Sequence, residues 1–163
     1  MLNIVLLHPE IPQNTGNIIR SVAATGTRLH LIKPLGFSLE DKFLKRAGLD
    51  YFDLADVEIH ESYEDFVQKY GNAKMYYAST KASRRYDEVN YEGDTFVMFG
   101  RETKGLPEEL LKDNYERSIR IPMRKGLRSL NLSNSVAIVL YEALRQGGFE
   151  GLEEKGKLTK YDV

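Results

Sequence analysis

Residues 95–107 have the sequence TFVMFGRETKGLP, in which an apolar strand pattern runs directly into a loop that is rich in glycine. The first five residues, which are β-branched, aromatic or apolar, predict a strand buried on both faces, as in parallel sheets. Gly100, Glu102 and Gly105 follow this strand, and Pro107 suits the first turn of a helix. The stretch therefore predicts a buried parallel strand with a functional loop at its carboxyl end.

Short apolar runs of the same kind alternate with helical patterns along most of the chain. This alternation is typical of an α/β fold, in which a mostly parallel sheet carries helices on both faces. The predicted strands cover residues 2–7, 29–32, 57–60, 74–78, 95–99 and 118–121. The predicted helices begin near residues 14, 38, 62, 108 and 133, and we expect Gly26 to end the first of them as a left-handed cap. Ser38 and Asp41 predict a capping-box start for the second helix.

The helical spacing also predicts which side chains face the core. In the first helix Arg20 lies roughly 130° from the centre of the apolar face, so its guanidinium is free to point toward a ligand. The residues expected to be buried are Ile18, Ile19, Val22 and Ala23 in the first helix, Leu39, Phe43, Leu44 and Ala47 in the second, Tyr63, Phe66, Val67 and Tyr70 in the third, and Val136, Ala137, Leu140, Ala143 and Leu144 in the last.

The composition excludes several classes of protein. With 163 residues, 42% of them apolar and a net charge of −1, we expect one globular domain over residues 1–149 and a charged, loose tail over 150–163, and not a disordered chain. The absence of cysteine excludes disulfides and thiolate chemistry and favours a cytoplasmic location. Three scattered histidines give no metal-ligand spacing, and no apolar run suits a signal peptide or a membrane helix.

Three polar segments follow predicted strands: NTGNIIR at 14–20, FGRETKGLP at 99–107 and IPMRKGLRSLNLSN at 121–134. Because the carboxyl ends of parallel strands share one edge of the sheet, we expect these segments to converge on one site. The nucleotide-binding patterns G-x-x-x-x-G-K-[ST] and G-x-G-x-x-G are missing, which disfavours a dinucleotide-dependent oxidoreductase. Taken singly, Asn14 could be a helix cap and Arg20 a solvated charge, so the functional interpretation depends on all three segments together.

Together and in this order, the three segments resemble the motifs of the SPOUT class of RNA methyltransferases. The resemblance runs from Met1 to about Phe149. It implies a deep C-terminal trefoil knot, a homodimer whose active sites are completed by the other subunit, and S-adenosyl-L-methionine as the cofactor. The small size resembles members of the class that methylate the ribose 2′-hydroxyl of the wobble nucleotide, position 34, in the anticodon loop of tRNA. The resemblance implies neither a metal nor a membrane.

The same resemblance implies roles for individual residues. It places Arg20, Glu102, Ser129, Asn131 and Asn14 in the catalytic set, with Tyr141 as a further candidate that could equally belong to the core. It places the cofactor against Ala78, Ser79, Gly100, Ile121, Met123, Ser129, Leu130 and Asn134. We expect RNA contacts from Arg20, Arg84, Arg124 and Lys125, because acid-free basic runs cover residues 11–39, 79–86 and 117–137.

Two alternatives remain open from the sequence. The first is the same methyl transfer at another tRNA or ribosomal RNA nucleotide. The second is a module of the same fold that binds RNA without catalysis, which the presence of Arg20, Glu102, Ser129 and Asn131 disfavours.

Overall fold

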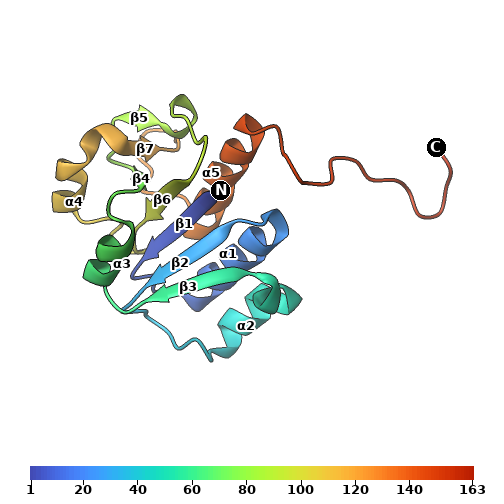
Figure 1. Ribbon diagram of the computed structural model, residues 1–163, viewed down its shortest axis with the longest axis horizontal. Coiled ribbons are helices and arrows are strands. Elements are labelled where there is room, and N and C mark those ends of the chain that lie inside the picture. The colour runs from blue at the N-terminus through green and yellow to red at the C-terminus, as the bar shows by residue number, and fades with distance from the viewer.

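The computed structural model describes the backbone of residues 1–163 and the side chains of all of them except residues 49 and 50. Seven strands form one sheet in the order β3-β2-β1-β6-β4-β7-β5, and every pairing is parallel (Figure 1). The predicted α/β class is therefore confirmed. The strands are β1 (Leu2–Leu7), β2 (Arg28–Ile32), β3 (Asp56–His60), β4 (Lys74–Ala78), β5 (Arg84–Arg85), β6 (Thr95–Phe99) and β7 (Ser118–Arg120).

Helices cover both faces of the sheet, because alternate residues of a strand point to opposite sides. Ile4 and Leu6 of β1 pack in the core on the side of α1, α2 and α5, whereas Val5 and Leu7 pack in the core on the side of α3 and α4. All four side chains are at most 4% exposed. The helices are α1 (Pro12–Thr25), α2 (Lys42–Gly48), α3 (Tyr63–Tyr70), α4 (Glu108–Asp113) and α5 (Leu132–Gln146).

The position of β6 creates a crevice at the edge of the sheet. β6 lies between β1 and β4, although four strands separate it from β1 in the chain. The chain leaves β1 toward α1 on one face and leaves β6 toward α4 on the other face. The two loops therefore diverge at the carboxyl ends of adjacent strands, which is where parallel sheets bind ligands.

Several predicted boundaries are confirmed and others need correction. β1, β4 and β6 have the predicted bounds, and Gly26 caps α1 in the left-handed conformation. α1 begins at Pro12, however, and the predicted capping box of α2 is wrong. Asp41 accepts the N–H groups of Phe43 and Leu44, so α2 starts after Asp41 and not at Ser38.

The predicted inward faces are too wide in the two short helices. Phe43 of α2 and Val67 of α3 are 40% and 39% exposed, so both predictions of burial were wrong, whereas Leu44 and Phe66 are buried as expected. A helix of seven or eight residues has only about two turns. The spacing of its apolar residues does not show how much of its surface the neighbouring elements bury. In α5 the buried Val139 was not predicted, and Ala137, Ala143 and Leu144 are only half-buried.

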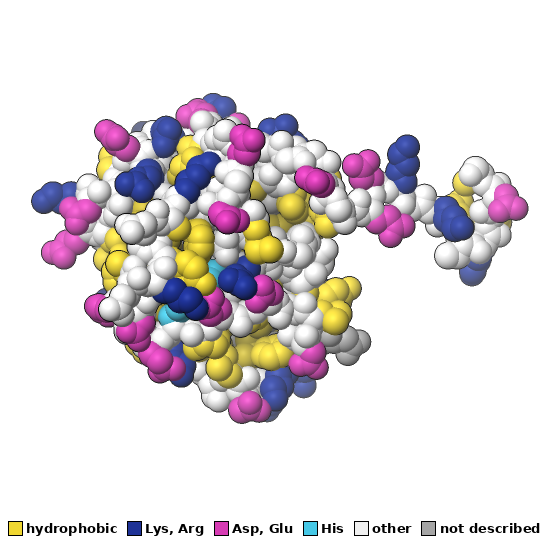
Figure 2. Space-filling model, in the orientation of Figure 1, with side chains coloured by type: hydrophobic (Ala, Val, Ile, Leu, Met, Phe, Trp, Pro, Cys, Tyr) yellow, Lys and Arg dark blue, Asp and Glu magenta, His cyan; other side chains and the backbone are white. Residues whose placement is uncertain are grey.

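No helix or strand follows α5 in the described chain, and the last residues extend away from the sheet (Figure 1). A separate loose tail over residues 150–163 stays a prediction. Among the described residues no helix has both the length and the apolarity that a bilayer crossing requires. On the face shown in Figure 2, basic and acidic side chains are interspersed, so charges of both signs lie close together there.

A hydrogen-bonded histidine pair lies in the core between the sheet and α3. The Nε2 atom of His30 lies 2.9 Å from Asn3 Oδ1, which can only accept, so this nitrogen carries the proton. The Nδ1 atom of His30 therefore accepts from His60 Nε2 at 3.0 Å. Burial, reinforced by the neighbouring His60, lowers the pKa of His30 to about 4.

This buried pair predicts a pH-dependent stability. Because the folded-state pKa of His30 lies below the usual value of 6.5, the unfolded chain binds a proton that the folded chain does not, between those two pH values. We expect the free energy of unfolding to fall by about 2 kcal/mol from pH 7 to pH 5 on account of His30. Urea unfolding at both pH values measures the difference, and His30→Gln should reduce it. An equal pH dependence in this variant would contradict the assignment.

Candidate active site

A cavity of about 580 Å³ opens at the carboxyl ends of β4, β6 and β7, with the start of α1 on its rim. Its volume is within the range of small-molecule sites. The predicted convergence of the polar loops is therefore confirmed, and the loop after β4 joins them. The lining comprises residues 78–81, 99–106, 119–121 and 128–132, together with Ile11, Asn14, Tyr86, Met123, Ser135 and Val139.

A chain of hydrogen bonds through two amides links the three polar segments beside this cavity. Asn131 caps α5, and its Oδ1 accepts the N–H groups of Ser133 and Asn134 at 2.9 and 3.3 Å. Asn131 Nδ2 therefore faces Asn14 and donates to Asn14 Oδ1 at 3.1 Å. Asn14 Nδ2 donates in turn to Glu102 Oε1 at 3.5 Å. Each amide has one possible orientation, so the network fixes its donors and acceptors.

Glu102 holds the loop before α1 in place. Its Oε2 accepts the N–H of Glu10 at 2.8 Å, and its Oε1 accepts the N–H of Ile11 at 3.3 Å. α1 has no side-chain cap of its own, so this carboxylate satisfies backbone donors at the helix start and complements its dipole. Asn14 lies inside α1 and is buried, which excludes the alternative that Asn14 is the helix cap.

A reciprocal bond closes the contact between the same two loops. Glu10 Oε1 accepts from the backbone N–H and the hydroxyl of Thr103, at 3.1 and 2.7 Å. These two bonds lower the pKa of Glu10 and so favour its charged form, and the bond from the Thr103 hydroxyl has the larger effect. The sequence analysis missed Glu10, because an acid before a helix gives no signal of a partner 93 residues away.

The loop after β6 folds tightly on itself. The N–H of Gly105 donates to the carbonyl of Arg101 at 2.8 Å, and Gly105 has a φ of +65° that favours glycine. A Cβ atom on Gly100 would lie 2.1 Å from the carbonyl carbon of Gly105 and 2.2 Å from the nitrogen of Leu106. Both glycines are therefore required by geometry, which fixes the shape of one wall of the cavity.

Most of the residues that the sequence placed in the site do line the cavity. They are Asn14, Ala78, Ser79, Gly100, Glu102, Ile121, Met123, Ser129, Leu130 and Asn131. Asn134 does not line it, whereas its neighbour Ser135 does. Arg124 and Lys125 are exposed on the same loop outside the lining. Arg84 lines a separate small hollow, where its guanidinium donates to the carbonyl of Glu116.

Arg20 lies apart from the cavity of its own chain. It is exposed on α1, as predicted from the helical angle, and is not among the lining residues. Its guanidinium carbon lies 5.3 Å from the centre of the Tyr51 ring. Tyr141, which the sequence left between site and core, is 48% exposed and therefore not a core residue.

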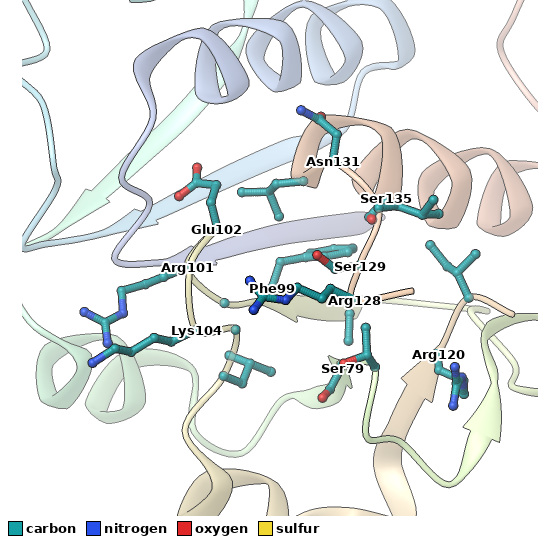
Figure 3. A pocket seen from close by; sticks show the side chains of 18 of the residues that line it. Ser79, Phe99, Arg101, Glu102, Lys104, Arg120, Arg128, Ser129, Asn131 and Ser135 are labelled. Atoms are coloured by element: carbon teal, nitrogen blue, oxygen red, sulfur yellow. The ribbon is translucent and has the colours of Figure 1, made fainter. Parts of the chain in front are cut away.

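Five cationic side chains of the lining were not among the predicted RNA contacts: Lys81 and a group of four, Arg101, Lys104, Arg120 and Arg128. Arg101 and Lys104 extend to the same side of the loop after β6 (Figure 3). Among the residues whose side chains are described, none of the four forms an ion pair, whereas Lys81 on the same rim pairs with Glu108. Arg120 and Arg128 could have been predicted, because they lie in the acid-free run from Arg117 to Ala137. Arg101 and Lys104 could not, because Glu102 lies between them and interrupts the basic pattern.

The one group of described side chains that could hold a metal ion comprises His30, Glu58 and His60. None of them lines the cavity. Burial alone would raise the pKa of Glu58, but hydrogen bonds from Lys69 and Tyr70 outweigh it and lower this pKa to about 2. The histidines bond each other, and Glu58 accepts from Lys69 and Tyr70, so hydrogen bonds already account for the close approach of these three side chains.

Residues 1–141, which include the whole network described above, match the SpoU rRNA Methylase family. The chain belongs to this family. A curated relative from Methylovorus glucosotrophus, named tRNA (cytidine(34)-2'-O)-methyltransferase, is 56% identical over 93% of this chain and 99% of its own length. A relative of the same name from Photorhabdus asymbiotica is 50% identical over 93% of this chain and 97% of its own. The resemblance seen in the three segments is confirmed.

Two solved structures are similar to the chain in fold. One, described as giving structural insights into the 2-OH methylation of C/U34 on tRNA, has a TM-score of 0.87 at 41% identity and covers 92% of this chain and 98% of its own. Another, an AdoMet-bound rRNA methyltransferase from Sinorhizobium meliloti, has a TM-score of 0.79 at 26% identity, over 88% of this chain and 56% of its own.

Proposed function

We propose that this chain transfers a methyl group from S-adenosyl-L-methionine to the ribose 2′-hydroxyl of the wobble nucleotide, position 34, of tRNA. The observation that carries the proposal is the Asn131–Asn14–Glu102 chain of hydrogen bonds, which unites three motif segments around one cavity. Its support comes from relatives that carry this activity in their name and match the chain over nearly their whole length. We infer a cytoplasmic location from the tRNA substrate.

The cavity has the mixture of groups that the cofactor requires. Leu106, Leu130 and Val139 offer apolar surface for an adenine ring, and the hydroxyls of Ser79 and Ser129 offer hydrogen bonds to ribose hydroxyls. We expect Ala78, Ser79, Gly100, Ile121, Met123, Ser129 and Leu130 to hold the cofactor, with backbone groups of the strand-end loops supplying much of the contact. When bound, S-adenosyl-L-methionine supplies an electrophilic methyl group.

Arg20 is proposed to act on the RNA side of the reaction. A ribose 2′-hydroxyl is weakly acidic, so its attack requires alignment and stabilisation of negative charge on the oxygen. The guanidinium of Arg20 keeps its protons at ordinary pH and therefore cannot serve as the base. It binds a backbone phosphate through its planar fork and stabilises the oxygen, and the proton leaves to that phosphate or to water.

The other polar groups orient the site. The Glu102 carboxylate accepts two backbone N–H groups and the amide of Asn14, so its proposed role is to hold two loops together. Asn131 caps the start of α5 and so fixes the end of the preceding loop, on which Ser129 lies. These residues maintain the shape of the cavity on which the alignment of the reacting groups depends.

A homodimer accounts for two further observations. Arg20 lies outside the cavity of its own chain. In a homodimer, the Arg20 of each copy would reach the cavity of the other copy. Ile11, Leu127, Leu130 and Tyr141 are large apolar side chains, each at least 40% exposed, on segments that carry or adjoin the motifs. Their burial between two copies would supply hydrophobic stabilisation. We also infer the deep trefoil knot, for which the family membership is the support.

The unpaired cations of the rim are proposed to contact RNA phosphates near the reacting ribose. Arg101 and Lys104 lie on a rigid loop, and the anion that best compensates two adjacent cations is a phosphate. Arg120 and Arg128 extend this cationic rim along the cavity. Arg84, Arg124 and Lys125 are proposed to contact RNA farther from the cavity.

Removing the two rim charges should weaken RNA binding and leave the cofactor site intact. For Arg101→Gln with Lys104→Gln, we expect the slope of log affinity against log salt to decrease by about one unit per lost phosphate contact. Calorimetry should give an unchanged affinity for S-adenosyl-L-methionine. Lys42→Gln on the exposed side of α2 is the matched control and should leave the salt slope unchanged. An unaltered slope in the double variant would refute the proposed contact.

The function is tested by incubating the purified protein with tRNA and S-adenosyl-L-methionine and mapping the product by mass spectrometry of nuclease fragments. We expect one methyl group, on the ribose of nucleotide 34. Methylation of another tRNA or ribosomal RNA nucleotide would instead support the same chemistry with a different target. Cofactor and RNA binding with no transfer to any RNA would support the non-catalytic module.

A further inference from the structure

The exposed Arg20 and the half-buried Tyr51 lie against each other. The guanidinium carbon of Arg20 lies 5.3 Å from the centre of the Tyr51 ring, within the range of a cation–π contact. Tyr51 belongs to the 3-10 helix Leu49–Leu54, which follows α2. Among the described side chains, Arg20 forms no ion pair and no hydrogen bond. Within the described part of the chain, the aromatic ring is therefore the side chain that lies against its charged end.

The close approach of α1 and α2 at Gly16 brings Tyr51 to this position. A Cβ atom on Gly16 of α1 would lie 2.5 Å from both the Ala47 Cβ and the Leu44 carbonyl oxygen of α2, so the two helices touch at a point that only glycine permits. Gly48, which ends α2, lies beside the same point, where a Cβ atom would make only ordinary contact, 3.6 Å from the Gly16 oxygen. The chain then turns directly into the segment that carries Tyr51.

The contact with the ring occupies none of the guanidinium's N–H donors, because no described residue accepts a hydrogen bond from Arg20. A guanidinium carries five such donors, and they remain available to a ligand. A long arginine side chain has several rotatable bonds, and ordering them on binding costs free energy. A ring that restrains the group beforehand reduces this cost without occupying a donor.

We infer that Tyr51 is a positioning residue for Arg20, which it holds ready to bind the phosphate or the developing oxyanion of the substrate RNA. The inference depends on the proposed function, in which Arg20 acts on RNA. The ring, and not the hydroxyl, does the positioning, because no hydrogen bond joins the two side chains. Tyr51 touches no reacting atom in this account and acts only through Arg20.

The test is a graded set of variants at Tyr51. Tyr51→Phe retains the ring and should keep kcat within about twofold of the wild type, whereas Tyr51→Leu retains apolar bulk without the ring and should lower kcat about tenfold. The affinity for S-adenosyl-L-methionine and the melting temperature should stay the same in both variants. A merely structural role would instead lower the melting temperature and would not separate Phe from Leu in kcat.

A second measurement addresses the contact itself. In NMR spectra the side-chain protons of Arg20 should show the upfield shift caused by a ring in the wild type and in Tyr51→Phe, and should lose this shift in Tyr51→Leu. In single-turnover assays Tyr51→Leu should add no further loss to Arg20→Ala. A full tenfold loss in the Arg20→Ala background would overturn the inference, because Tyr51 would then act independently of Arg20.

The failure of this inference differs from the failure of the proposed function. If Arg20→Ala retained wild-type turnover, the role proposed for Arg20 would be wrong and the inference would fall with it. If Arg20→Ala were inactive while Tyr51→Leu matched the wild type, only the positioning role of Tyr51 would be wrong.

Discussion

Replacing Arg20 with lysine is expected to lower the turnover of methyl transfer at least about 100-fold, which is the size of effect seen when one oxyanion donor is removed. The ammonium group is a point charge that cannot reproduce the planar, two-pronged contact of a guanidinium with a phosphate. The affinity for S-adenosyl-L-methionine should change less than about twofold, since the proposed contacts of Arg20 are with RNA and not with the cofactor. Steady-state kinetics and calorimetry measure the two quantities.

The matched control for this variant is Arg46→Lys, which makes the same chemical change on an exposed position of α2. It should leave both turnover and cofactor affinity unaltered. A turnover of Arg20→Lys close to that of the wild type would show that charge alone is sufficient and would refute the proposed phosphate clamp.

Gly100→Ala is expected to abolish high-affinity cofactor binding and to destabilise the protein by about 3 kcal/mol. The added Cβ atom would lie 2.1 Å from the carbonyl carbon of Gly105 and 2.2 Å from the nitrogen of Leu106. Both are backbone atoms and cannot rotate away as a side chain could, so the whole loop after β6 must open. Because this loop forms a wall of the cavity and carries Glu102, its displacement also separates the hydrogen-bonded loops.

Gly147→Ala is the control for this prediction. Gly147 has a φ of −85°, and a Cβ atom there would meet only carbonyl oxygens at 3.7 and 3.8 Å, which is ordinary contact. Denaturant unfolding should give this variant nearly the wild-type stability, and calorimetry should give the wild-type cofactor affinity. Equal behaviour of the Gly100 and Gly147 variants would mean that the tight loop does not shape the cofactor site.

The sequence predicted the layers of the fold because they depend on local patterns. The bounds of β1, β4 and β6 follow from apolar runs with clear ends, and Gly26 marks the end of α1 through its left-handed conformation. β5 was missed, because two residues, Arg84 and Arg85, contain no period, and their strand exists only through pairing with β7. The position of β6 between β1 and β4 is equally invisible to local patterns.

The site was predictable as a set of segments and not as a geometry. The segments that contain Asn14, Glu102 and Asn131 could be placed at one sheet edge, since parallel strands share that edge. That Glu102 satisfies the backbone before α1, or that Glu10 holds Thr103, depends on contacts between residues about 90 positions apart. The placement of Tyr51 against Arg20 similarly depends on a helix contact that no period in the sequence reveals.

The central claim is that the chain methylates the 2′-hydroxyl of nucleotide 34, and a single-atom change in the substrate tests it most directly. Two otherwise identical tRNA molecules, one with ribose and one with 2′-deoxyribose at position 34, are incubated with the protein and S-adenosyl-L-methionine labelled in its methyl group. The account predicts that the ribose form gains label and that the deoxyribose form gains none while it still binds. Equal labelling of both forms would contradict it.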